Sequence, residues 1–449
     1  MGRLFGTDGA RGVANSELTC ELAMNIGRAA AMVLTDSSHR HPKILIGKDT
    51  RISSDMLEGA LTAGLCSVGA DVVSLGVVPT PAVAFLVGKY KADAGVMISA
   101  SHNPCEFNGI KIFSGDGYKL PDALEEQIEA IVLDHAVTPS VPVGGDIGRV
   151  SVAENCVKDY IDHIKSTVPF ALDGMEIAVD CANGSASRTA ERLFTELGAK
   201  VHMLADKPNG VNINDNCGST HMEPLMDYVK EHSLDCGIAF DGDADRFLAV
   251  DDKGQLVDGD FVMAICAADM KSRGKLAKNA AVGTIMTNMG FSRFCEENGM
   301  KFVATKVGDR YVLEEMLLEE YNFGGEQSGH IIFLDFATTG DGQLTAAQLL
   351  SILKRRNAKL SSLATLMSRY PQVMVNVNVS PEGKLRFYTD AEIKAATEQA
   401  KATLGKSGRV IVRVSGTEPL IRVMVEGEDP EQIDGIAHSL ANLVEQRLG

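Results

Sequence analysis

Short apolar runs alternate with amphipathic segments along most of the chain. The runs KILIG (43–47), DVVSLG (71–76) and AGVMISA (94–100) have the length and composition of strands. Between the first two, SSDMLEGALTAGLCSVG (53–69) shows the spacing of an amphipathic helix. Strands that alternate with helices predict α/β units with largely parallel pairing.

The same rhythm returns around residues 175–246 and again around 280–333, and polar, glycine-containing stretches separate the cycles at 138–148 and 251–260. After residue 372 the pattern changes. Period-2 alternation in VMVNVNVS, RVIVRVS and LIRVMVEG, with a helix expected over 390–404, is typical of an antiparallel sheet. The sequence therefore predicts an α/β protein with three similar α/β sandwich domains of mixed sheets and a smaller C-terminal α+β domain. The expected boundaries are 1–152, 153–252, 253–366 and 367–449.

Each α/β cycle closes with an apolar strand that runs into a polar loop, the place where open α/β sheets bind ligands. In the second cycle, DGDADR puts Asp241, Asp243 and Asp245 directly after the strand CGIAF. Carboxylates this close repel one another, and a hard divalent cation with oxygen ligands relieves the repulsion. An EF-hand is excluded because the sixth loop position is Arg246 and the twelfth is Asp252. A tight loop with few ligands favours Mg²⁺, while a solvated acidic turn is the plain alternative.

The first cycle closes in ISASHNP, which presents Ser101, and Lys111 follows in the strand-like NGIKIF. By itself Ser101 is typical of a turn or a cap. Strand alternation, however, would return the Lys111 ammonium to the same loop. A phosphoryl group on Ser101 would add negative charge and acceptor oxygens that a cation and a lysine can hold.

Three further loops carry polar groups at strand ends. FGTDGARG (5–12) presents Arg11 and lacks the glycine order of a dinucleotide fingerprint. RVSGTEPLIR offers a tight turn flanked by arginines, which suits a phosphate dianion; its candidate residues are Arg413, Ser415, Gly416, Thr417 and Arg422. GGEQSGHIIF offers Glu326, Ser328 and His330, although a lone histidine is by default a hydrogen-bonded structural residue.

Composition narrows the class of protein. The chain of 449 residues has 43 Lys and Arg against 60 Asp and Glu, and its net charge of −17 argues against a nucleic-acid or anionic-membrane partner. Its nine cysteines form no Cys-x-x-Cys pair, which favours free thiols in a reducing compartment. No signal-peptide core and no apolar stretch of transmembrane length occur. We expect a cytoplasmic protein.

Taken together and in this order, ISASHNP, DGDADR, GGEQSGH and RVSGTEPLIRV resemble the signature loops of the α-D-phosphohexomutase family, one in each domain. FGTDGARGVAN, GEQSGH and TTGDGQ (338–343) resemble more narrowly the bacterial branch that acts on glucosamine phosphates. The likeness spans nearly the whole chain. It implies four domains around a central cleft, a phosphoserine at Ser101, and Mg²⁺ held by the Ser101 phosphate, Asp241, Asp243 and Asp245.

The resemblance also implies the reaction. Glucosamine 6-phosphate and glucosamine 1-phosphate would interconvert through a bisphosphorylated sugar, a step towards UDP-N-acetylglucosamine. Arg11 and Lys111 would supply charge, and Lys111 and His330 match family positions that handle protons or orient the reacting hydroxyl. Arg246, Glu326 and Ser328 would bind the sugar. The residues of the arginine-flanked turn would hold the phosphate that does not react.

One departure from the wider family bears on specificity. Related phosphomannomutases have a histidine after the KxG turn, whereas here Asp309 and Arg310 follow Gly308, which favours the amino sugar. The same chemistry on glucose or mannose phosphates, a Mg²⁺-dependent sugar phosphatase and a sugar-phosphate-binding regulator stay open as alternatives. The resemblance suggests a homodimer.

Overall fold

The computed structural model describes residues 2–6, 8–34, 41–139, 141–415 and 419–449. The chain forms two compact units. The first comprises Met1–Met286 and Gly299–Leu366, and the second comprises Thr287–Asn298 and Met367–Gly449. In the described residues, the first unit contains three sheets and the second contains one.

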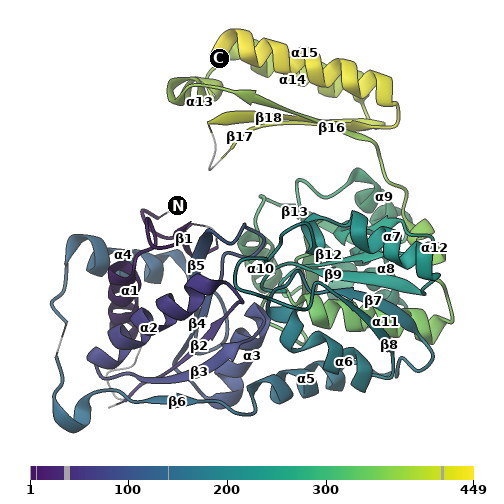
Figure 1. Ribbon diagram of the computed structural model, residues 1–449. Coiled ribbons are helices and arrows are strands. Elements are labelled where there is room, and N and C mark those ends of the chain that lie inside the picture. Colours follow the sequence, from purple (N-terminus) through teal and green to yellow (C-terminus); the bar gives the residue numbers. More distant parts are fainter. Residues whose placement is uncertain (1, 7, 35–40, 140, 416–418) are drawn as a thin grey trace. The chain divides into compact units, whose positions relative to one another are not determined.

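Six strands form the first sheet, in the order β1-β5-β4-β2-β3-β6 (Figure 1). They are β1 (Ala10–Val13), β2 (Lys43–Lys48), β3 (Asp71–Val77), β4 (Ala94–Ile98), β5 (Phe107–Ser114) and β6 (Val150–Val152). The accompanying helices are α1 (Cys20–Leu34), α2 (Ile52–Ser67), α3 (Thr80–Tyr90) and α4 (Asp122–Asp134). Every residue of β4 is buried, which explains why this strand is an uninterrupted apolar run in the sequence.

The second sheet has the order β11-β10-β9-β7-β8. Its strands are β7 (Glu176–Asp180), β8 (Lys200–Leu204), β9 (Cys236–Phe240), β10 (Phe247–Val250) and β11 (Leu256–Val257). The helices along this part of the chain are α5 (Cys156–Thr167), α6 (Ala190–Glu196) and α7 (Glu223–His232). β7 pairs in parallel with both β8 and β9, as expected for βαβ units.

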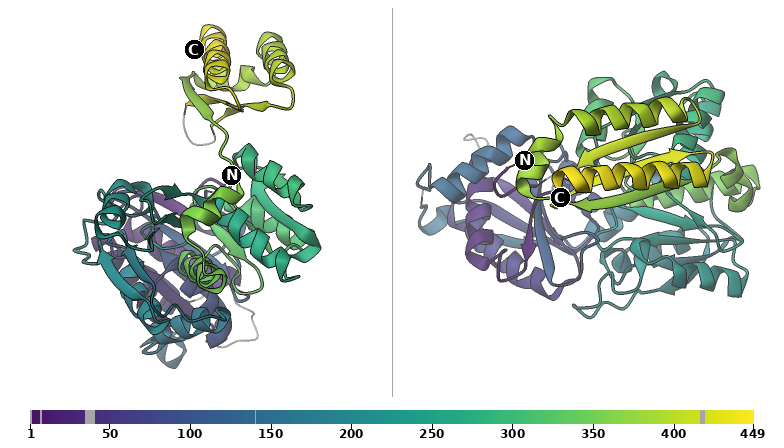
Figure 2. Two further views of the ribbon diagram at one scale, coloured as in Figure 1. Left: turned by 90° about the vertical axis from the view of Figure 1, so that its right-hand side faces the viewer. Right: turned by 90° about the horizontal axis from the view of Figure 1, so that it is seen from above.

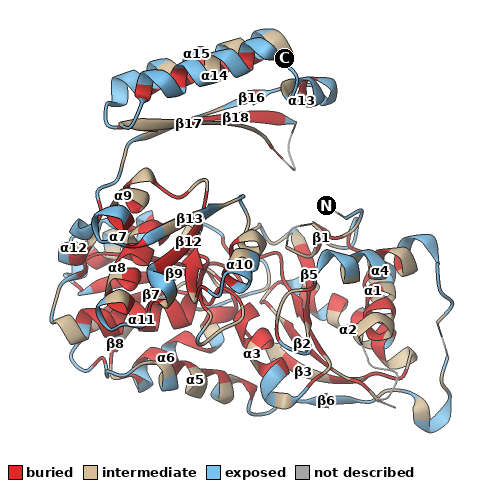
Figure 3. Ribbon diagram, turned by 180° about the vertical axis from the view of Figure 1, so that it is seen from behind, coloured by how far each residue is buried: buried red, intermediate tan, exposed pale blue. Residues whose placement is uncertain are grey.

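The third sheet has the order β13-β12-β14-β15. Its strands are β12 (Ala280–Thr284), β13 (Lys301–Thr305), β14 (Phe323–Gly325) and β15 (Ile331–Phe333). The helices of this part are α8 (Gly259–Ser272), α10 (Asp309–Leu318), α11 (Gly342–Arg356) and α12 (Leu360–Leu363). Figure 3 shows buried residues concentrated in the strands of the first unit and exposed residues on the outer faces of its helices.

The three sheets share one feature that positions the candidate site. In each, an apolar strand and its successor, β4 and β5, β9 and β10, or β14 and β15, pair antiparallel. The loops between these pairs are ISASHNP, DGDADR and EQSGH. The alternation of strands and helices predicted mainly parallel pairing, and these pairs are the exceptions that make the sheets mixed.

Helix α11 joins the second and third parts of the first unit and is buried over most of its length. Two of its side-chain amides bond to neighbouring elements: Gln343 Nε2 donates to Thr189 Oγ1 at 2.6 Å, and Gln348 Nε2 donates to Thr167 Oγ1 at 2.9 Å. Buried amides need such partners, so these bonds hold the second sheet's helices against α11.

The second unit is a three-stranded antiparallel sheet, in the order β16-β18-β17, with helices on one face. Its elements are α9 (Met289–Glu297), β16 (Gln372–Asn378), α13 (Pro381–Phe387), α14 (Ala391–Leu404), β17 (Gly408–Val414), β18 (Leu420–Gly427) and α15 (Pro430–Leu448). Figure 2 shows α14 and α15 side by side over the sheet, and their apolar residues form the core of this unit. The predicted fold class, α/β with a small α+β C-terminal part, is confirmed.

Among the residues that the structure describes, no helix is both long and apolar enough to cross a membrane. All nine cysteines carry free thiols, and six of them are buried.

Candidate active site

Ser101 lies in the turn between β4 and β5, with the left-handed φ of +52°. Its hydroxyl is buried and donates to Asp241 Oδ2 at 2.5 Å. The backbone on both sides is held by side chains: Ser101 N donates to Ser99 Oγ at 2.9 Å, and Ser101 O accepts from Asn214 Nδ2 at 2.9 Å. A non-glycine residue in this conformation costs free energy, so the surrounding bonds must impose it.

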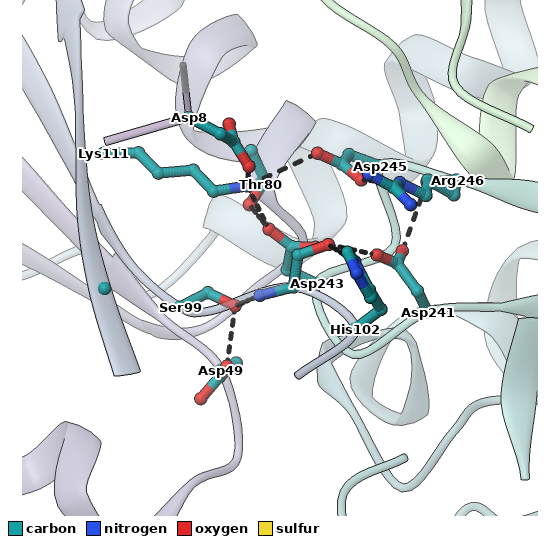
Figure 4. A network of polar contacts seen from close by, with 12 residues as sticks. Asp8, Asp49, Thr80, Ser99, His102, Lys111, Asp241, Asp243, Asp245 and Arg246 are labelled. Carbon is teal, nitrogen blue, oxygen red and sulfur yellow. Dashed lines mark hydrogen bonds and ion pairs between the residues drawn. The ribbon is translucent and has the colours of Figure 1, made fainter. Parts of the chain in front are cut away.

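A buried ion pair between Asp49 and Arg51 supports the Ser101 turn. Asp49 Oδ2 accepts from Ser99 Oγ at 2.7 Å (Figure 4). It also accepts from Arg51 Nε at 2.8 Å. The Arg51 guanidinium also donates to Ser101 O at 3.0 Å. Both side chains of the pair are fully buried. Asp49 and Arg51 were not predicted as site residues, although KDTR directly follows the strand KILIG and was a visible signal.

Asp241, Asp243 and Asp245 form one compact cluster after β9. One carboxylate oxygen of each lies within 4.8 Å of the others, and all three side chains are buried. Burial, followed by repulsion from Asp245 and Asp243, raises the pKa of Asp241 well above its usual range. Oδ1 of Asp243 and Oδ1 of Asp245 are buried without a hydrogen-bond partner. Clustered carboxylate oxygens that lack donors fit a hard divalent cation such as Mg²⁺.

Close backbone approach brings the Ser101 turn and the aspartate loop together. A Cβ on Gly242 would lie 2.6 Å from Ser101 O and 2.9 Å from Asn214 Nδ2, so only glycine fits here. From the other side, Thr80 N donates to Asp243 O at 2.9 Å, and Thr80 Oγ1 donates to Asp243 Oδ2 at 2.6 Å. Thr80 was not identified from the sequence.

The Lys111 ammonium lies among carboxylates. Its Nζ is 2.8 Å from Asp243 Oδ2, 3.1 Å from Asp8 Oδ2 and 3.4 Å from Asp245 Oδ2. Figure 4 shows the lysine side chain directed towards Asp243 and Asp8. Burial lowers the pKa of Lys111, but Asp243, Asp8 and Asp245 together outweigh it and raise the pKa well above 10.5. Lys111 is therefore a cation in this arrangement.

Two arginines and a histidine lie around the Ser101 turn and the aspartate loop. Arg11 pairs with Asp8, and its NH1 donates to Asn103 Oδ1 at 3.3 Å. Arg246 N donates to Asp241 Oδ1 at 3.2 Å. His102 Nδ1 is 3.3 Å from Ser101 Oγ, and burial and then the two guanidiniums lower its pKa to about 4. A neutral imidazole and two guanidiniums suit a phosphate ligand.

The loop between β14 and β15 carries Glu326, Ser328 and His330. Glu326 Oε1 accepts from Gly308 N at 3.1 Å, and Ser328 is partly exposed. His330 is buried, with Nδ1 3.7 Å from Asp245 Oδ2 and Nε2 accepting from Gly340 N at 3.1 Å. The β14–β15 loop thus approaches the aspartate cluster through His330.

The phosphate-binding candidates of the last domain lie in the second unit. Arg413 on β17 and Arg422 on β18 face each other across the antiparallel ladder, and Ser415 N donates to Leu420 O at 2.9 Å. Burial and then the neighbouring Arg422 charge lower the pKa of Arg413. Like charges directly opposite each other destabilise an antiparallel strand pair, and a bound anion would reduce their repulsion. Gly416 and Thr417 lie outside the described residues.

Known protein families match most of the chain. The chain matches four domain families of phosphoglucomutase/phosphomannomutase: alpha/beta/alpha domain I at residues 2–137, domain II at 158–254, domain III at 258–370 and the C-terminal domain at 374–443. Phosphoglucosamine mutase of Caldanaerobacter subterraneus subsp. tengcongensis is 57% identical over 448 residues, covering 100% of both chains. That of Clostridium novyi is 54% identical over 447 residues, covering 100% of this chain and 99% of the relative.

Solved structures share the fold. A phosphoglucomutase/phosphomannomutase family protein from Burkholderia thailandensis has a TM-score of 0.84 at 24% identity, covering 99% of this chain and 98% of that one. Aspergillus fumigatus N-acetylphosphoglucosamine mutase, in complex with GlcNAc-6P and magnesium, has a TM-score of 0.70 at 16% identity, covering 99% and 96%. With four matched domains and high identity to full-length relatives, this chain belongs to the phosphoglucosamine mutases of the α-D-phosphohexomutase superfamily.

Proposed function

We propose that the protein interconverts glucosamine 6-phosphate and glucosamine 1-phosphate with Ser101 as the phosphoryl carrier. The observation that carries the proposal is the 2.5 Å contact of Ser101 Oγ with Asp241, one of three clustered and buried aspartates. Phospho-Ser101 gives its phosphoryl group to the free hydroxyl of the sugar phosphate, which loses its proton. The bisphosphorylated sugar then returns its other phosphoryl group to Ser101.

The metal site of this proposal consists of Asp241, Asp243, Asp245 and the Ser101 phosphate. Two buried aspartate oxygens without donors support it. Mg²⁺ bound there would neutralise charge on the transferring phosphoryl group.

The protein groups would act mainly by charge and alignment, which is what phosphoryl transfer requires. Lys111 and Arg11 lie on the Asp8 side of the aspartate cluster and would stabilise negative charge that develops on the phosphoryl oxygens. His330 would orient the reacting hydroxyl or its proton. Lys111 is the stronger candidate for proton handling, once phosphate and metal have changed the charge around it.

Substrate recognition would divide between the two units. Arg246, Glu326 and Ser328 would bind the sugar beside the aspartate cluster. Arg413, Ser415, Gly416, Thr417 and Arg422 would hold the phosphate that is not being transferred. One phosphate must stay bound while the bisphosphate turns over, so we propose that the C-terminal domain moves during the reaction.

We further propose that the enzyme works in the cytoplasm, where its nine free thiols stay reduced, and that it forms a homodimer. The domain boundaries at residues 152, 252 and 366 stay predictions.

The test is a direct comparison of substrates. Wild-type enzyme should convert glucosamine 6-phosphate faster than glucose 6-phosphate or mannose 6-phosphate, and Ser101→Ala should abolish all three conversions. Preference for a hexose phosphate would support the phosphoglucomutase or phosphomannomutase alternative. Release of free phosphate faster than 1-phosphate would identify a phosphatase, and unchanged activity of Ser101→Ala would overturn the proposal.

A further inference from the structure

Two segments of the first unit, 119–125 and 309–314, contact each other through ion pairs of both polarities. Lys119 Nζ lies 2.5 Å from Asp309 Oδ2. At the next residue the segment 309–314 supplies the positive charge instead of the negative one. The Arg310 guanidinium pairs with Asp122 and lies 3.5 Å from Glu125 Oε2. We call the Lys119–Asp309 contact the inner pair and the Arg310 contacts the outer pairs.

The inner pair belongs to a closed ring in which carboxylates alternate with basic side chains. Its members, in order, are Asp309, His330, Asp245, Lys111, Asp8 and Lys119. From Asp309, one arm of the ring passes through His330, whose Nε2 is 3.4 Å from Asp309 Oδ2 and whose Nδ1 is 3.7 Å from Asp245 Oδ2.

The other arm starts at Lys119. Lys119 Nζ is 2.6 Å from Asp8 Oδ1, and Asp8 Oδ2 is 3.1 Å from Lys111 Nζ. Lys111 then meets Asp245 and closes the ring. The two arms from the inner pair therefore end on the same aspartate of the metal-binding cluster.

Distance and burial together distinguish the inner pair from the outer ones. Lys119 and Asp309 are 14% and 15% exposed and lie 2.5 Å apart. Arg310 and Glu125 are equally buried, at 16% each, but lie 3.5 Å apart, and Asp122 is 74% exposed. Solvent weakens the exposed pair, while loss of one member of a buried pair leaves an uncompensated charge. The inner pair is therefore the stronger electrostatic constraint.

We infer that Lys119 and Asp309 are positioning residues: they hold the side chains of Lys111 and His330 in place beside the aspartate cluster. This inference rests on the proposed function. Lys119 acts through Asp8 on Lys111, and Asp309 acts through His330. Lys119 follows β5 of the first sheet, and Asp309 begins α10. Their pair therefore fixes the Ser101 loop and the β14–β15 loop relative to each other.

The consequence is a loss of rate at saturating substrate. Small displacements of groups that align a transferred phosphoryl group cost about 100-fold in rate. Glu326 accepts from Gly308 N and not from Lys119 or Asp309, so sugar binding, and with it KM, should change much less than kcat.

The experiment compares Asp309→Asn, Lys119→Met and the double variant on glucosamine 6-phosphate. Each single variant should lower kcat by about 100-fold, with KM changed by less than about threefold. Because the two residues act as one unit, the double variant should fall within about threefold of the worse single variant. Asp309→Glu, which keeps the charge, should recover part of kcat.

Two matched variants separate positioning from general stability. Glu314→Gln removes an exposed partner of Arg310 and should leave kcat and KM unchanged. Arg310→Ala removes the outer pairs and should lower the unfolding temperature more than it lowers kcat. The inference is overturned if the loss of kcat relative to the loss of unfolding temperature is the same for Asp309→Asn as for Arg310→Ala.

The inference is also overturned if either single variant keeps kcat within twofold of wild type, or if the effects of the two variants multiply. Should Asp309→Asn fail to fold, Lys119→Met alone still decides between these results. A wild type that prefers a hexose phosphate would contradict the proposed substrate. The same variants, assayed on that hexose phosphate, would still decide the role of the inner pair.

Discussion

The position of Ser101 depends on groups distant in the sequence. Its turn is fixed by Ser99, by the Asp49–Arg51 pair and by Asn214, which together impose a positive φ. The hydroxyl consequently points at Asp241 instead of solvent. A nucleophile held this way loses little conformational entropy when it reacts.

Thr80 allows a test of the proposed metal site at the scale of one hydroxyl. Thr80→Val keeps the shape but removes the donor to Asp243 Oδ2, so that carboxylate is less well oriented. Loss of such a partner should weaken Mg²⁺ binding by about 10-fold or more, as measured by calorimetric titration of the dephosphorylated protein. Thr397→Val, on α14 of the second unit, is the control. Equal affinity of wild type and Thr80→Val would contradict the assignment.

At the scale of elements, the three antiparallel strand pairs explain how the loops carry chemistry. Each pair delivers a short polar loop at the end of a buried strand, and the loops of β4–β5, β9–β10 and β14–β15 meet around the aspartate cluster. Helix α11 begins beside these loops: Asp341 is its N-cap, and Gly342 N donates to Ala244 O of the aspartate loop at 3.0 Å.

Asp341 predicts a pH dependence of stability. Burial raises its pKa from the ordinary 3.8 to about 6, although Leu344 N and the Tyr160 hydroxyl both donate to it. Because the folded state holds the proton more tightly than the unfolded state, this group loses its stabilising contribution as the pH rises from about 4 to about 6.

Asp341→Asn keeps both acceptor bonds and cannot ionise. Relative to wild type, the variant should therefore gain stability with rising pH, by about 2 kcal/mol between pH 4 and pH 7. Urea unfolding at several pH values measures the difference. A gap that stays constant with pH, or that grows in favour of wild type, would show that Asp341 does not ionise in this window.

The sequence predicted elements better than contacts. The strands around residues 43–47, 71–76 and 94–100 lie almost where the apolar runs placed them, because buried strands have a strong local signal. Helix α15 was omitted from the prediction, although Ile433, Ala437, Leu440 and Val444 recur at helical spacing. Mixed sheets were predicted correctly, but the strands that pair antiparallel were not identified, since short connections between strands and their direction depend on turn geometry.

Within the candidate site, the motif loops were visible but their supports were not. Asp241, Asp243 and Asp245 stand together in the sequence, so their cluster could be read locally. Lys119 and Asp309 are separated by 190 positions. Asp309 stood out in the sequence only as a residue that bears on sugar specificity, and Lys119 did not stand out at all, so only long-range packing could reveal the pair.

At the scale of the whole molecule, the chain divides its proposed work between two compact units. The first brings together Ser101, the aspartates, Lys111 and His330, and the second carries the opposed arginines Arg413 and Arg422. A division of this kind suits a reaction in which one phosphate is held while the other is transferred.

The opposed arginines allow a test of this division. Arg422→Ala should raise KM for glucosamine 6-phosphate by about 10- to 100-fold, because a charged hydrogen bond to phosphate contributes about 1.5–3 kcal/mol. It should leave phosphorylation of Ser101 intact. Arg386→Ala, an exposed arginine of the same unit, is the control. An unchanged KM would remove Arg422 from the phosphate site.

The most direct test of the central claim is the mass of the peptide that carries Ser101. After incubation with glucosamine 1,6-bisphosphate and Mg²⁺, the 96–111 segment should gain the mass of one phosphoryl group, located on Ser101. Addition of excess glucosamine 6-phosphate should then remove it as bisphosphate forms. A segment that stays unmodified while the mutase turns over, or a phosphoryl group on another residue, would contradict the account.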